Sequence, residues 1–384
     1  MPEQPAKQRL LIVADDLTGA GDAAGPFAAG RVVEVARSGE LAGACAADVL
    51  SVSTGSRQLP PAEAADSVRN ALAAAGWDRF DRIYKKIDST MKGSPGAEIE
   101  SILRVTGATV ALTTPAHPVQ GRRVIGGRLL VRHEGGDAPS VAELLSSQTS
   151  LLVRRTSLDE HRLPPSPEIW VADADTQDDL RQVVRFSSRF AARMVLAGSA
   201  GLSRELAGSM RVGQQGEPPT QRIDRLSGPF VVAVGSNNAA TQTQVKHFCQ
   251  AASAEHCEPP YDPSVLNQAL DAGRPLVVRV GRGDEAAAQL AEVVALLSRR
   301  RPGHIVVTGG DTAAALCDRM GVTRLRVAAE IYDSVPLLLA TDGSLPGWRL
   351  VTKAGGFGDE SCLVDLYETL AAPPAALRGK QHVL

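Results

Sequence analysis

Three acidic side chains and two glycines follow directly after the first apolar run of the chain. Residues 15–22 read DDLTGAGD, and the run before them covers residues 9–14. In open α/β sheets, ligands bind at the carboxyl ends of the strands. The N–H groups at a helix start can hold an anion, and a carboxylate placed there can take up a proton or hold a metal. The alternative is structural: Asp16 or Thr18 caps the helix and Asp22 is solvated.

A second polar segment, residues 86–96, reads KIDSTMKGSPG. Because side chains alternate between the two faces of a strand, Lys86 and Asp88 emerge together at the strand end. Two hydroxyls, Lys92 and a glycine turn follow them. Cations suit a carboxylate, whereas hydroxyl and carboxylate groups suit alcohols, so the segment predicts a site for a hydroxylated acid. A purely structural strand-to-helix loop is the alternative.

Three glycine-containing turns in the C-terminal half have the residue types that bind phosphates. Their sequences are VGSNN at 234–238, VVTGGDT at 306–312 and KAGGFGD at 353–359. Glycines allow close backbone approach, helix starts expose N–H groups, and a lysine adds a cation, which together suit a polyphosphate. Each turn alone is a common feature of helix starts. Three of them in one half of the chain predict a nucleotide site.

Several other motifs match known functional motifs, but their position in the chain or the absence of a partner motif argues against those functions. The GAGD at 19–22 copies the anion-hole tetrad of ribokinase-like sugar kinases, but those proteins carry it late in the chain. STMK at 89–92 matches the S-x-x-K of serine β-lactamases, yet the S-D-N motif is missing from the sequence. No P-loop, G-x-G-x-x-G or H-E-x-x-H motif is present. The seven histidines do not cluster, and we interpret His117, which lies in a proline-rich loop, as structural.

These segments need strands and helices to position them, and the sequence alternates between the two. In the N-terminal half, strands are expected at 9–14, 48–53, 82–87, 108–113, 150–155, 168–172 and 193–197, with helices at 61–75, 95–105 and 176–190. In the C-terminal half, strands are expected at 229–235, 275–280, 304–308, 324–330, 335–340 and 348–352, with helices at 239–251, 284–300, 311–320 and 360–371. Strand followed by helix, repeated, predicts mainly parallel sheets covered by helices.

The chain is long for a single core, because 384 residues at about 150 per domain predict two domains. A polar stretch without periodicity, residues 211–228, is the predicted linker. It separates an N-terminal domain, 1–210, from a C-terminal domain, 229–384. The predicted fold is therefore α/β: two domains with mainly parallel sheets flanked by helices, and an active site in the interdomain cleft.

The composition excludes several classes of function. Hydrophobic residues make up 43% and charged residues 22%, which is typical of a globular protein, and a net charge of −2 lacks the overall basic character of a nucleic-acid binder. No apolar run reaches membrane-spanning length, and the N-terminus has no signal-peptide pattern. Five scattered cysteines without a C-x-x-C pair argue against a disulfide framework or a structural zinc site. We therefore expect a cytoplasmic protein that binds neither nucleic acid nor membrane, with a homodimer expected only on general grounds of symmetry.

Taken in order, these segments resemble the four-carbon acid sugar kinase family, which includes DUF1537-like proteins. The matching stretches are ADDLTG at 14–19, TGSRQLP at 54–60, KIDST at 86–90, PAHP at 115–118 followed by Gly121 and Arg122, GSAGL at 198–202, Gly235 with Ser236, GGDT at 309–312 and KAGGFG at 353–358. The likeness runs in one collinear order from roughly residue 10 to residue 370. That order is far more specific than any single motif.

This resemblance implies an ATP-dependent kinase that phosphorylates the terminal hydroxyl of threonate, erythronate or a keto-tetronate, with Mg²⁺ bridging the phosphates. It implies that the N-terminal domain binds the sugar acid through Asp15, Thr18, Gly19, Arg57, Lys86, Asp88, Ser89, Thr90 and Lys92, with the cations holding its carboxylate. It implies that the C-terminal domain binds ATP through Ser236, Gly309, Gly310, Asp311, Thr312, Lys353, Gly355, Gly356, Phe357 and Gly358, with Lys353 offsetting phosphate charge. Asp16 or Asp22 would orient or deprotonate the hydroxyl, and the sequence leaves that choice and the metal ligands open.

The chain departs from the family pattern at three places. The family usually has arginine where Lys92 stands, asparagine-isoleucine at 94–95, and serine-glycine-asparagine at 354–356. Lysine keeps the charge but loses the two-pronged grip on a carboxylate, so these departures bear on the substrate more than on the reaction class. Two other functions stay open: a non-catalytic sensor of a sugar acid or nucleotide, and a ribokinase-like kinase of a neutral sugar with Asp22 as the base.

Overall fold

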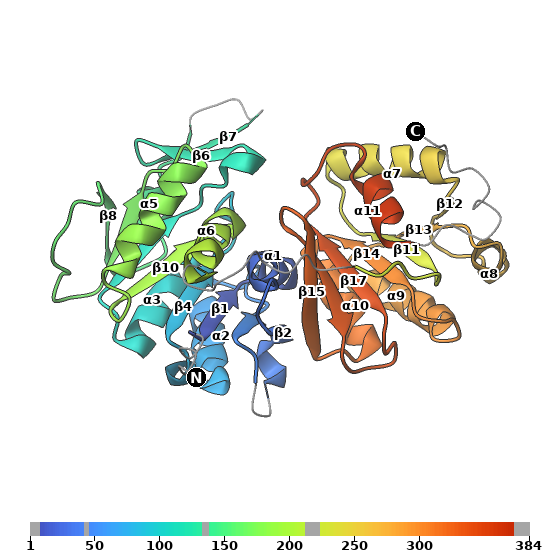
Figure 1. Ribbon diagram of the computed structural model, residues 1–384, viewed down its shortest axis with the longest axis horizontal. Helices are drawn as coiled ribbons and strands as arrows, with labels where there is room; N and C mark the ends of the chain where they lie inside the picture. The colour runs from blue at the N-terminus through green and yellow to red at the C-terminus, as the bar shows by residue number, and fades with distance from the viewer. Residues whose placement is uncertain (1–7, 42–45, 133–137, 212–222, 372–384) are drawn as a thin grey trace, which may run out of the picture. The chain divides into compact units, whose positions relative to one another are not determined.

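The computed structural model describes residues 8–41, 46–132, 138–211 and 223–371, and the chain divides into two compact units, residues 1–219 and 220–384. Each unit is a β-sheet covered by helices (Figure 1). The predicted α/β fold class with mainly parallel sheets is therefore confirmed. The predicted linker, 211–228, lies largely outside the described residues.

The sheet of the first unit has the strand order β2-β3-β1-β4-β10-β5-β9-β8, and every neighbouring pair in it is parallel. The strands are β1 (Leu10–Ala14), β2 (Val33–Arg37), β3 (Val49–Ser53), β4 (Arg82–Lys86), β5 (Val110–Thr114), β8 (Leu152–Thr156), β9 (Glu168–Ala172) and β10 (Met194–Gly198). All positions of β1, β3, β5 and β10 are buried, as is typical of parallel strands covered on both faces. A separate antiparallel hairpin consists of β6 (Arg122–Ile125) and β7 (Arg128–Val131).

Two groups of helices cover this sheet. In one group, α1 (Leu17–Ala24) and α5 (Gln177–Ser188) both pack against α6 (Ala200–Arg211). In the other, α2 (Pro61–Ala75) and α4 (Val141–Ser146) both pack against α3 (Pro95–Thr106). Right-handed crossovers that run in opposite directions along a sheet lie on opposite faces. Since the chain runs from β1 toward β2 but from β3 past β1 to β4, α1 and α2 cover opposite faces.

The sheet of the second unit has the strand order β12-β13-β11-β14-β17-β16-β15, with parallel pairs as far as β17 and antiparallel pairs beyond it. The strands are β11 (Phe230–Val234), β12 (Glu255–Cys257), β13 (Leu276–Arg279), β14 (His304–Thr308), β15 (Arg324–Tyr332), β16 (Val335–Ala340) and β17 (Arg349–Lys353). The helices are α7 (Ala239–Ala252), α8 (Pro263–Asp271), α9 (Gly283–Leu297), α10 (Gly310–Met320) and α11 (Cys362–Leu370). Helix α7 packs with α11 and α9 packs with α10 (Figure 1).

Both sheets share one arrangement of four strands, β2-β3-β1-β4 in the first unit and β12-β13-β11-β14 in the second. In the first unit, the chain leaves β1 toward one edge of the sheet and leaves β4 toward the other edge. In the second unit, it leaves β11 and β14 in the same two directions. The loops after β1 and β4, and those after β11 and β14, therefore flank a topological switch point. Ligands of open α/β sheets bind in the crevice at this place, outside the carboxyl ends of the strands. The two predicted polar segments and two of the three glycine turns lie at the ends of these four strands, and the third glycine turn, 353–359, lies at the end of β17.

Candidate active site

The loop after β1 places two adjacent carboxylates at the switch point of the first unit. Asp16 is the N-cap of α1, with φ −140° and ψ 166°, and its Oδ1 accepts a hydrogen bond of 2.6 Å from the N–H of Gly19. A Cβ on Gly19 would lie 2.6 Å from Asp16 Oδ1 and 3.2 Å from Lys86 Nζ. Glycine at this position therefore lets the Asp16 carboxylate and the Lys86 ammonium approach the start of the helix together.

Arg57, from the loop between β3 and α2, joins three carboxylates. Its Nε and one terminal nitrogen lie 2.7 and 2.8 Å from the two carboxylate oxygens of Asp15, a bidentate pair. Its other terminal nitrogen lies 2.6 Å from Asp16 Oδ2, and Asp88 Oδ2 is 3.6 Å from the guanidinium. All three nitrogens of Arg57 therefore face carboxylates of the chain itself, so a substrate carboxylate would have to share them.

The pKa values of the two adjacent carboxylates are shifted in opposite directions. Burial raises the pKa of Asp15, but the charge and hydrogen bonds of Arg57, with help from Lys85 and Lys86, outweigh it, so this pKa lies below its ordinary value. Burial also raises the pKa of Asp16, and there the charge of Arg57 does not compensate for burial together with the repulsion from Asp15. The pKa of Asp16 therefore lies above its ordinary value. Such a split is typical of sites that assign different tasks to two carboxylates.

The loop after β4 brings the second predicted segment to the same switch point. The Lys86 side chain is almost fully buried, and its Nζ donates a hydrogen bond of 3.0 Å to the carbonyl of Ile87. Asp88 Oδ1 accepts from the N–H and the hydroxyl of Thr90, at 2.8 and 2.6 Å. Burial raises the pKa of Asp88, but Arg57, Lys86 and the Thr90 bonds lower it below its ordinary value. Asp88 is therefore an ionised acceptor at neutral pH.

The remaining residues of this loop differ in exposure. Ser89 is partly exposed and Lys92 is exposed, so the Lys92 ammonium is accessible to a ligand. Gly93 has φ +84°, and a Cβ there would lie 3.2 Å from Asp15 Oδ2. The loop therefore turns back onto the Asp15 carboxylate at Gly93.

Gln148, which the sequence did not indicate as a site residue, binds the backbone of this loop through its side chain. Its side-chain oxygen accepts a bond of 2.9 Å from the N–H of Gly96, in the first turn of α3, and its nitrogen donates one of 3.3 Å to the carbonyl of Gly93. Ser94, the N-cap of α3, makes no side-chain capping bond. Gln148 therefore satisfies a helix-start N–H that a capping side chain would ordinarily satisfy.

A buried ion pair lies behind Asp15. Lys85 Nζ is 3.0 Å from Glu98 Oε2, and both side chains are almost fully buried. Ser56 donates a short hydrogen bond to the other oxygen of Glu98, and Ser56 is in turn 2.6 Å from the hydroxyl of Thr54. Burial and the charge of Asp15 both raise the pKa of Glu98, whereas the charge of Lys85 lowers it. The pKa of Glu98 therefore lies above its ordinary value. This network ties β4 and α3 to the loop that carries Arg57.

Two further predicted residues lie on α1. Thr18 is 3% exposed, and within the described part of the chain its hydroxyl has no hydrogen-bond partner. Asp22 is 4% exposed and lies six residues beyond Asp16, which corresponds to about 9 Å along the helix axis. The carboxylates that contact Arg57 are those of Asp15, Asp16 and Asp88. The structure therefore brings Asp16, and not Asp22, together with Arg57.

The loops after β5 and β10 pack against each other. The hydroxyl of Ser199 donates a bond of 2.6 Å to the carbonyl of Ala116, and the hydroxyl of Tyr84 donates one of 2.6 Å to the carbonyl of Ser199. A Cβ on Gly201 would lie 2.9 Å from the ring of His117, which is itself 1% exposed. The GSAGL and PAHP segments therefore support one another.

In the second unit, the three predicted glycine turns follow three adjacent strands, β11, β14 and β17. The N–H of Gly235 donates to the carbonyl of Thr308 at 3.3 Å, and the N–H of Gly309 donates to the carbonyl of Lys353 at 3.2 Å. A Cβ on Gly235 would lie 1.8 Å from the Thr312 hydroxyl oxygen. The turns therefore form one continuous backbone surface at the switch point of this sheet.

The loop after β17 is held by buried side chains. Lys353 is 0% exposed, and its Nζ donates to the carbonyls of Ala354 and Phe357 at 3.1 and 2.8 Å. The hydroxyl of Thr241, on α7, donates to the carbonyl of Gly355 at 2.7 Å. The role of Lys353 beside phosphates stays a prediction, and its contacts here are with the loop.

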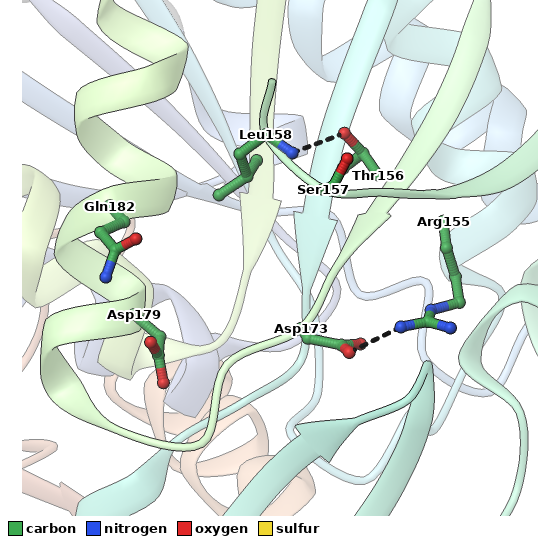
Figure 2. Close-up of a pocket in the computed structure, with 7 residues that line it drawn as sticks. All are labelled: Arg155, Thr156, Ser157, Leu158, Asp173, Asp179 and Gln182. Atoms are coloured by element: carbon green, nitrogen blue, oxygen red, sulfur yellow. Dashed lines mark hydrogen bonds and ion pairs between the residues drawn. The ribbon is translucent and has the colours of Figure 1, made fainter. Parts of the chain in front are cut away.

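A hollow of about 490 Å³ lies beside the carboxyl ends of β8 and β9 and is lined by Arg155, Thr156, Ser157, Leu158, Asp173, Asp179 and Gln182 (Figure 2). Figure 2 shows Arg155 directed at Asp173, with a terminal nitrogen 2.8 Å from Oδ2. Asp173 also accepts bonds of 2.8 and 2.7 Å from the N–H groups of Gly126 and Gly127. These charged groups satisfy one another within the wall, and none of the predicted site residues lines the hollow.

Within the described ranges, no group of three or more His, Cys, Asp or Glu side chains is arranged to hold a metal ion. Among the helices of those same ranges, none combines the length and the apolar character that a membrane span requires.

Two family models match separate parts of the chain. A family model described as a sugar-binding N-terminal domain matches residues 10–206, and one described as a nucleotide-binding C-terminal domain matches residues 264–363. The chain is 31% identical to a D-threonate kinase of Bordetella bronchiseptica, over 92% of this chain and 95% of the relative. It is 28% identical to a 3-oxo-tetronate kinase of Pseudomonas savastanoi pv. phaseolicola, over 95% of this chain and 98% of the relative.

A solved structure has the same fold. It is that of a DUF1537 protein from Haemophilus influenzae, which superposes with a TM-score of 0.67 at 20% identity, covering 94% of this chain and 98% of the other.

Proposed function

Because the chain belongs to the four-carbon acid sugar kinase family, we propose that it transfers the γ-phosphoryl group of ATP to the terminal hydroxyl of a four-carbon sugar acid. The relatives include proteins named D-threonate kinase, 3-oxo-tetronate kinase and D-erythronate kinase, so threonate, erythronate and the keto-tetronates are the candidate substrates. The observation that carries the proposal is the cluster of charged side chains at the carboxyl ends of β1 and β4, where Asp15, Asp16 and Arg57 meet Lys86.

In this proposal, cations at the switch point hold the substrate carboxylate. Lys92 is exposed, and Lys86 lies beside the start of α1, so both are suited to this task. Ser89 and Thr90 contact substrate hydroxyls. Arg57 contributes by holding Asp15 and Asp16 in place, because its nitrogens are engaged by those carboxylates.

We assign the general base to Asp16. The terminal hydroxyl oxygen of the substrate forms a new bond to the γ-phosphorus, the bond from that phosphorus to the β–γ bridging oxygen breaks, and ADP leaves. The hydroxyl proton passes to the Asp16 carboxylate and then to solvent. A base with a raised pKa takes a proton more readily at neutral pH, and Asp16 has such a pKa and contacts Arg57.

The nucleotide belongs at the glycine turns of the second unit. Gly310 and Thr312, in the first turn of α10, offer N–H groups and a hydroxyl to phosphate oxygens, and Gly309 and Ser236 lie beside them. In kinases, phosphates supply several of the Mg²⁺ ligands, and one or two carboxylates complete the set. Asp311 is an exposed carboxylate in the first turn of α10 and is the side chain that fits this role. Bound there, Mg²⁺ would offset phosphate charge.

The test is a coupled ADP-release assay with ATP, Mg²⁺ and a panel of D-threonate, D-erythronate and 3-oxo-tetronate, with ribose and glycerate as controls. Turnover on one acid and not on the controls supports the proposal and names the substrate. Turnover on ribose alone would replace it with a neutral-sugar kinase. ATP binding without turnover on any panel member would favour a non-catalytic sensor, and failure to bind ATP would remove the nucleotide site.

The proposal extends to location and assembly. ATP as the phosphoryl donor places the reaction in the cytoplasm, and transfer requires the sugar-acid and nucleotide sites to come together during turnover. A homodimer is proposed because two-fold symmetric dimers are the commonest oligomers. Light scattering after size exclusion tests the dimer, since a mass equal to the 40.3 kDa chain would refute it.

A further inference from the structure

Gln244, on α7, makes an unusual set of contacts with the loop after β17. Its side-chain nitrogen lies 2.9, 3.0 and 2.8 Å from the carbonyl oxygens of Phe357, Gly358 and Asp359. The residue is 1% exposed, and within the described part of the chain its side-chain oxygen has no hydrogen-bond partner. The amide is therefore fully used as a donor and unused as an acceptor.

The unused acceptor argues that Gln244 is not present for stability alone. A buried polar atom without a partner destabilises the fold, and an apolar side chain of similar shape would avoid that cost. The amide cannot turn over either, because its oxygen would then face three carbonyl oxygens. The contacts therefore fix one orientation of the loop.

That orientation determines where the N–H groups of the loop point. In a planar trans peptide the N–H points opposite to the carbonyl of the preceding residue. Lys353 binds the carbonyl of Ala354, Thr241 binds that of Gly355, and Gln244 binds that of Phe357. The N–H groups of the residues that follow these carbonyls therefore point away from the three side chains. Those N–H groups belong to Gly355, Gly356 and Gly358.

These three N–H groups are available to a ligand. None of them donates a hydrogen bond to any atom in the described part of the chain, and Gly356 and Gly358 are exposed. Gly358 has φ +80°, which an L side chain rarely adopts, and a Cβ on Gly355 would lie 2.1 Å from Ser236 Oγ. Successive outward N–H groups form a concave surface that binds anions.

We infer that Gln244 is a positioning residue for the phosphates of the nucleotide: it turns the carbonyls of the 357–359 segment inward and thereby presents the backbone N–H groups of the loop to a polyphosphate. This inference rests on the proposed function, because that function supplies the nucleotide. Gln244 touches neither ATP nor the sugar acid, and it acts through the loop. Thr241 and Lys353 act with it by binding the carbonyls of Gly355 and Ala354, which precede Phe357.

The test compares Gln244→Glu with Gln250→Glu, the same change at an exposed position of the same helix. A carboxylate at 244 has no donor for the three carbonyls and repels them. ATP binding is measured by calorimetry without sugar acid, and KM and kcat are measured for both substrates. We expect Gln244→Glu to weaken ATP binding by at least about tenfold, with the sugar-acid KM unchanged, and Gln250→Glu to match the wild type.

A folded Gln244→Glu protein that binds ATP as tightly as the wild type would overturn the inference. Gln244→Met, which keeps the length and apolar packing but removes the donors, serves as the second variant where the charged one fails to fold. Unchanged ATP affinity in a folded Gln244→Met protein overturns the inference equally. Wild-type protein that binds ATP but turns over no acid refutes the proposed function and leaves this inference standing, so the two failures are distinguishable.

Discussion

The assignment of Asp16 as the base predicts a large and specific effect of Asp16→Asn. Asparagine caps a helix as well as aspartate does, so the bond from the Gly19 N–H and the start of α1 should persist. Arg57 loses one charge-assisted hydrogen bond, which contributes about 1.5–3 kcal/mol, but keeps its bidentate pair with Asp15. The variant should therefore fold with a modest loss of stability.

The loss of catalysis should be much larger than the loss of stability. A positioned general base contributes roughly 10²–10⁴-fold to the rate, which is about 3–5 kcal/mol of transition-state stabilisation. We expect kcat to fall by that factor in Asp16→Asn while the ATP affinity stays within about twofold of the wild type, because Asp16 lies in the other unit from the glycine turns. Initial rates from the ADP-release assay, at saturating sugar acid, measure this fall.

The pH profile provides an independent test. The base acts only when deprotonated, so kcat of the wild type should fall as the pH falls through the pKa of Asp16. Burial raises that pKa, so kcat should fall at a pH above the ordinary pKa of an aspartate, which is about 3.9. Asp16→Asn should lack this limb, and Asp22→Asn should keep it. Turnover of Asp16→Asn within about threefold of the wild type, or loss of the acid limb in Asp22→Asn instead, would refute the assignment.

Three further predictions concern the scaffold. In Gly355→Ala the new Cβ would lie 2.1 Å from Ser236 Oγ, so the KM for ATP should rise about tenfold or more in initial-rate assays with no change for the sugar acid; equal effects on both substrates would contradict it. Lys85→Met leaves the Glu98 carboxylate buried without its partner and should lower the free energy of unfolding in urea by about 3–5 kcal/mol, whereas a loss under about 1 kcal/mol would mean that the pair contributes little. Burial lowers the pKa of His304 to about 4 from an unfolded value of about 6.5, so the unfolded state binds a proton first as the pH falls. The wild type should therefore lose about 2 kcal/mol between pH 7 and pH 5 that His304→Gln does not lose, and parallel curves for the two proteins would exclude this cause.

Strong local signals made much of the fold predictable. The helix over Pro61–Ala75 has the bounds expected from its periodicity, because Pro61 stands in its first turn and Gly76, with φ +60°, follows its end. Strands β14 and β16 also have their expected bounds, because each is a short apolar run between turn residues. Strand β2 was not predicted, since Glu34 and Arg37 interrupt its apolar character. Three-residue strand β12 is too short to give a periodic signal.

The charged segments were predictable, but their partners were not. The sequence indicated Asp15, Asp16 and Arg57 as site residues, yet a pairing across about 40 positions has no local signature. Gln148 and Gln244 were missed for the same reason. Each is a single glutamine on a segment remote in sequence from the loop that it holds: Gln148 by 52 positions or more and Gln244 by 113 or more. Only the packed structure shows which of the chain's glutamines are buried against backbone carbonyls and N–H groups.

The shared strand order explains how one topology serves two substrates. In both units the loop after a short apolar strand lies at a switch point. The sheet therefore determines where a ligand binds, and the loop residues determine which ligand it is. The loops of the first unit carry Asp15, Asp16 and Lys86, which suits an acid with hydroxyl groups. The loops of the second unit replace side chains by glycine backbone at 235, 309 and 355, which suits a phosphate chain. A kinase needs one site of each kind, and changing the loop residues on one strand arrangement supplies both.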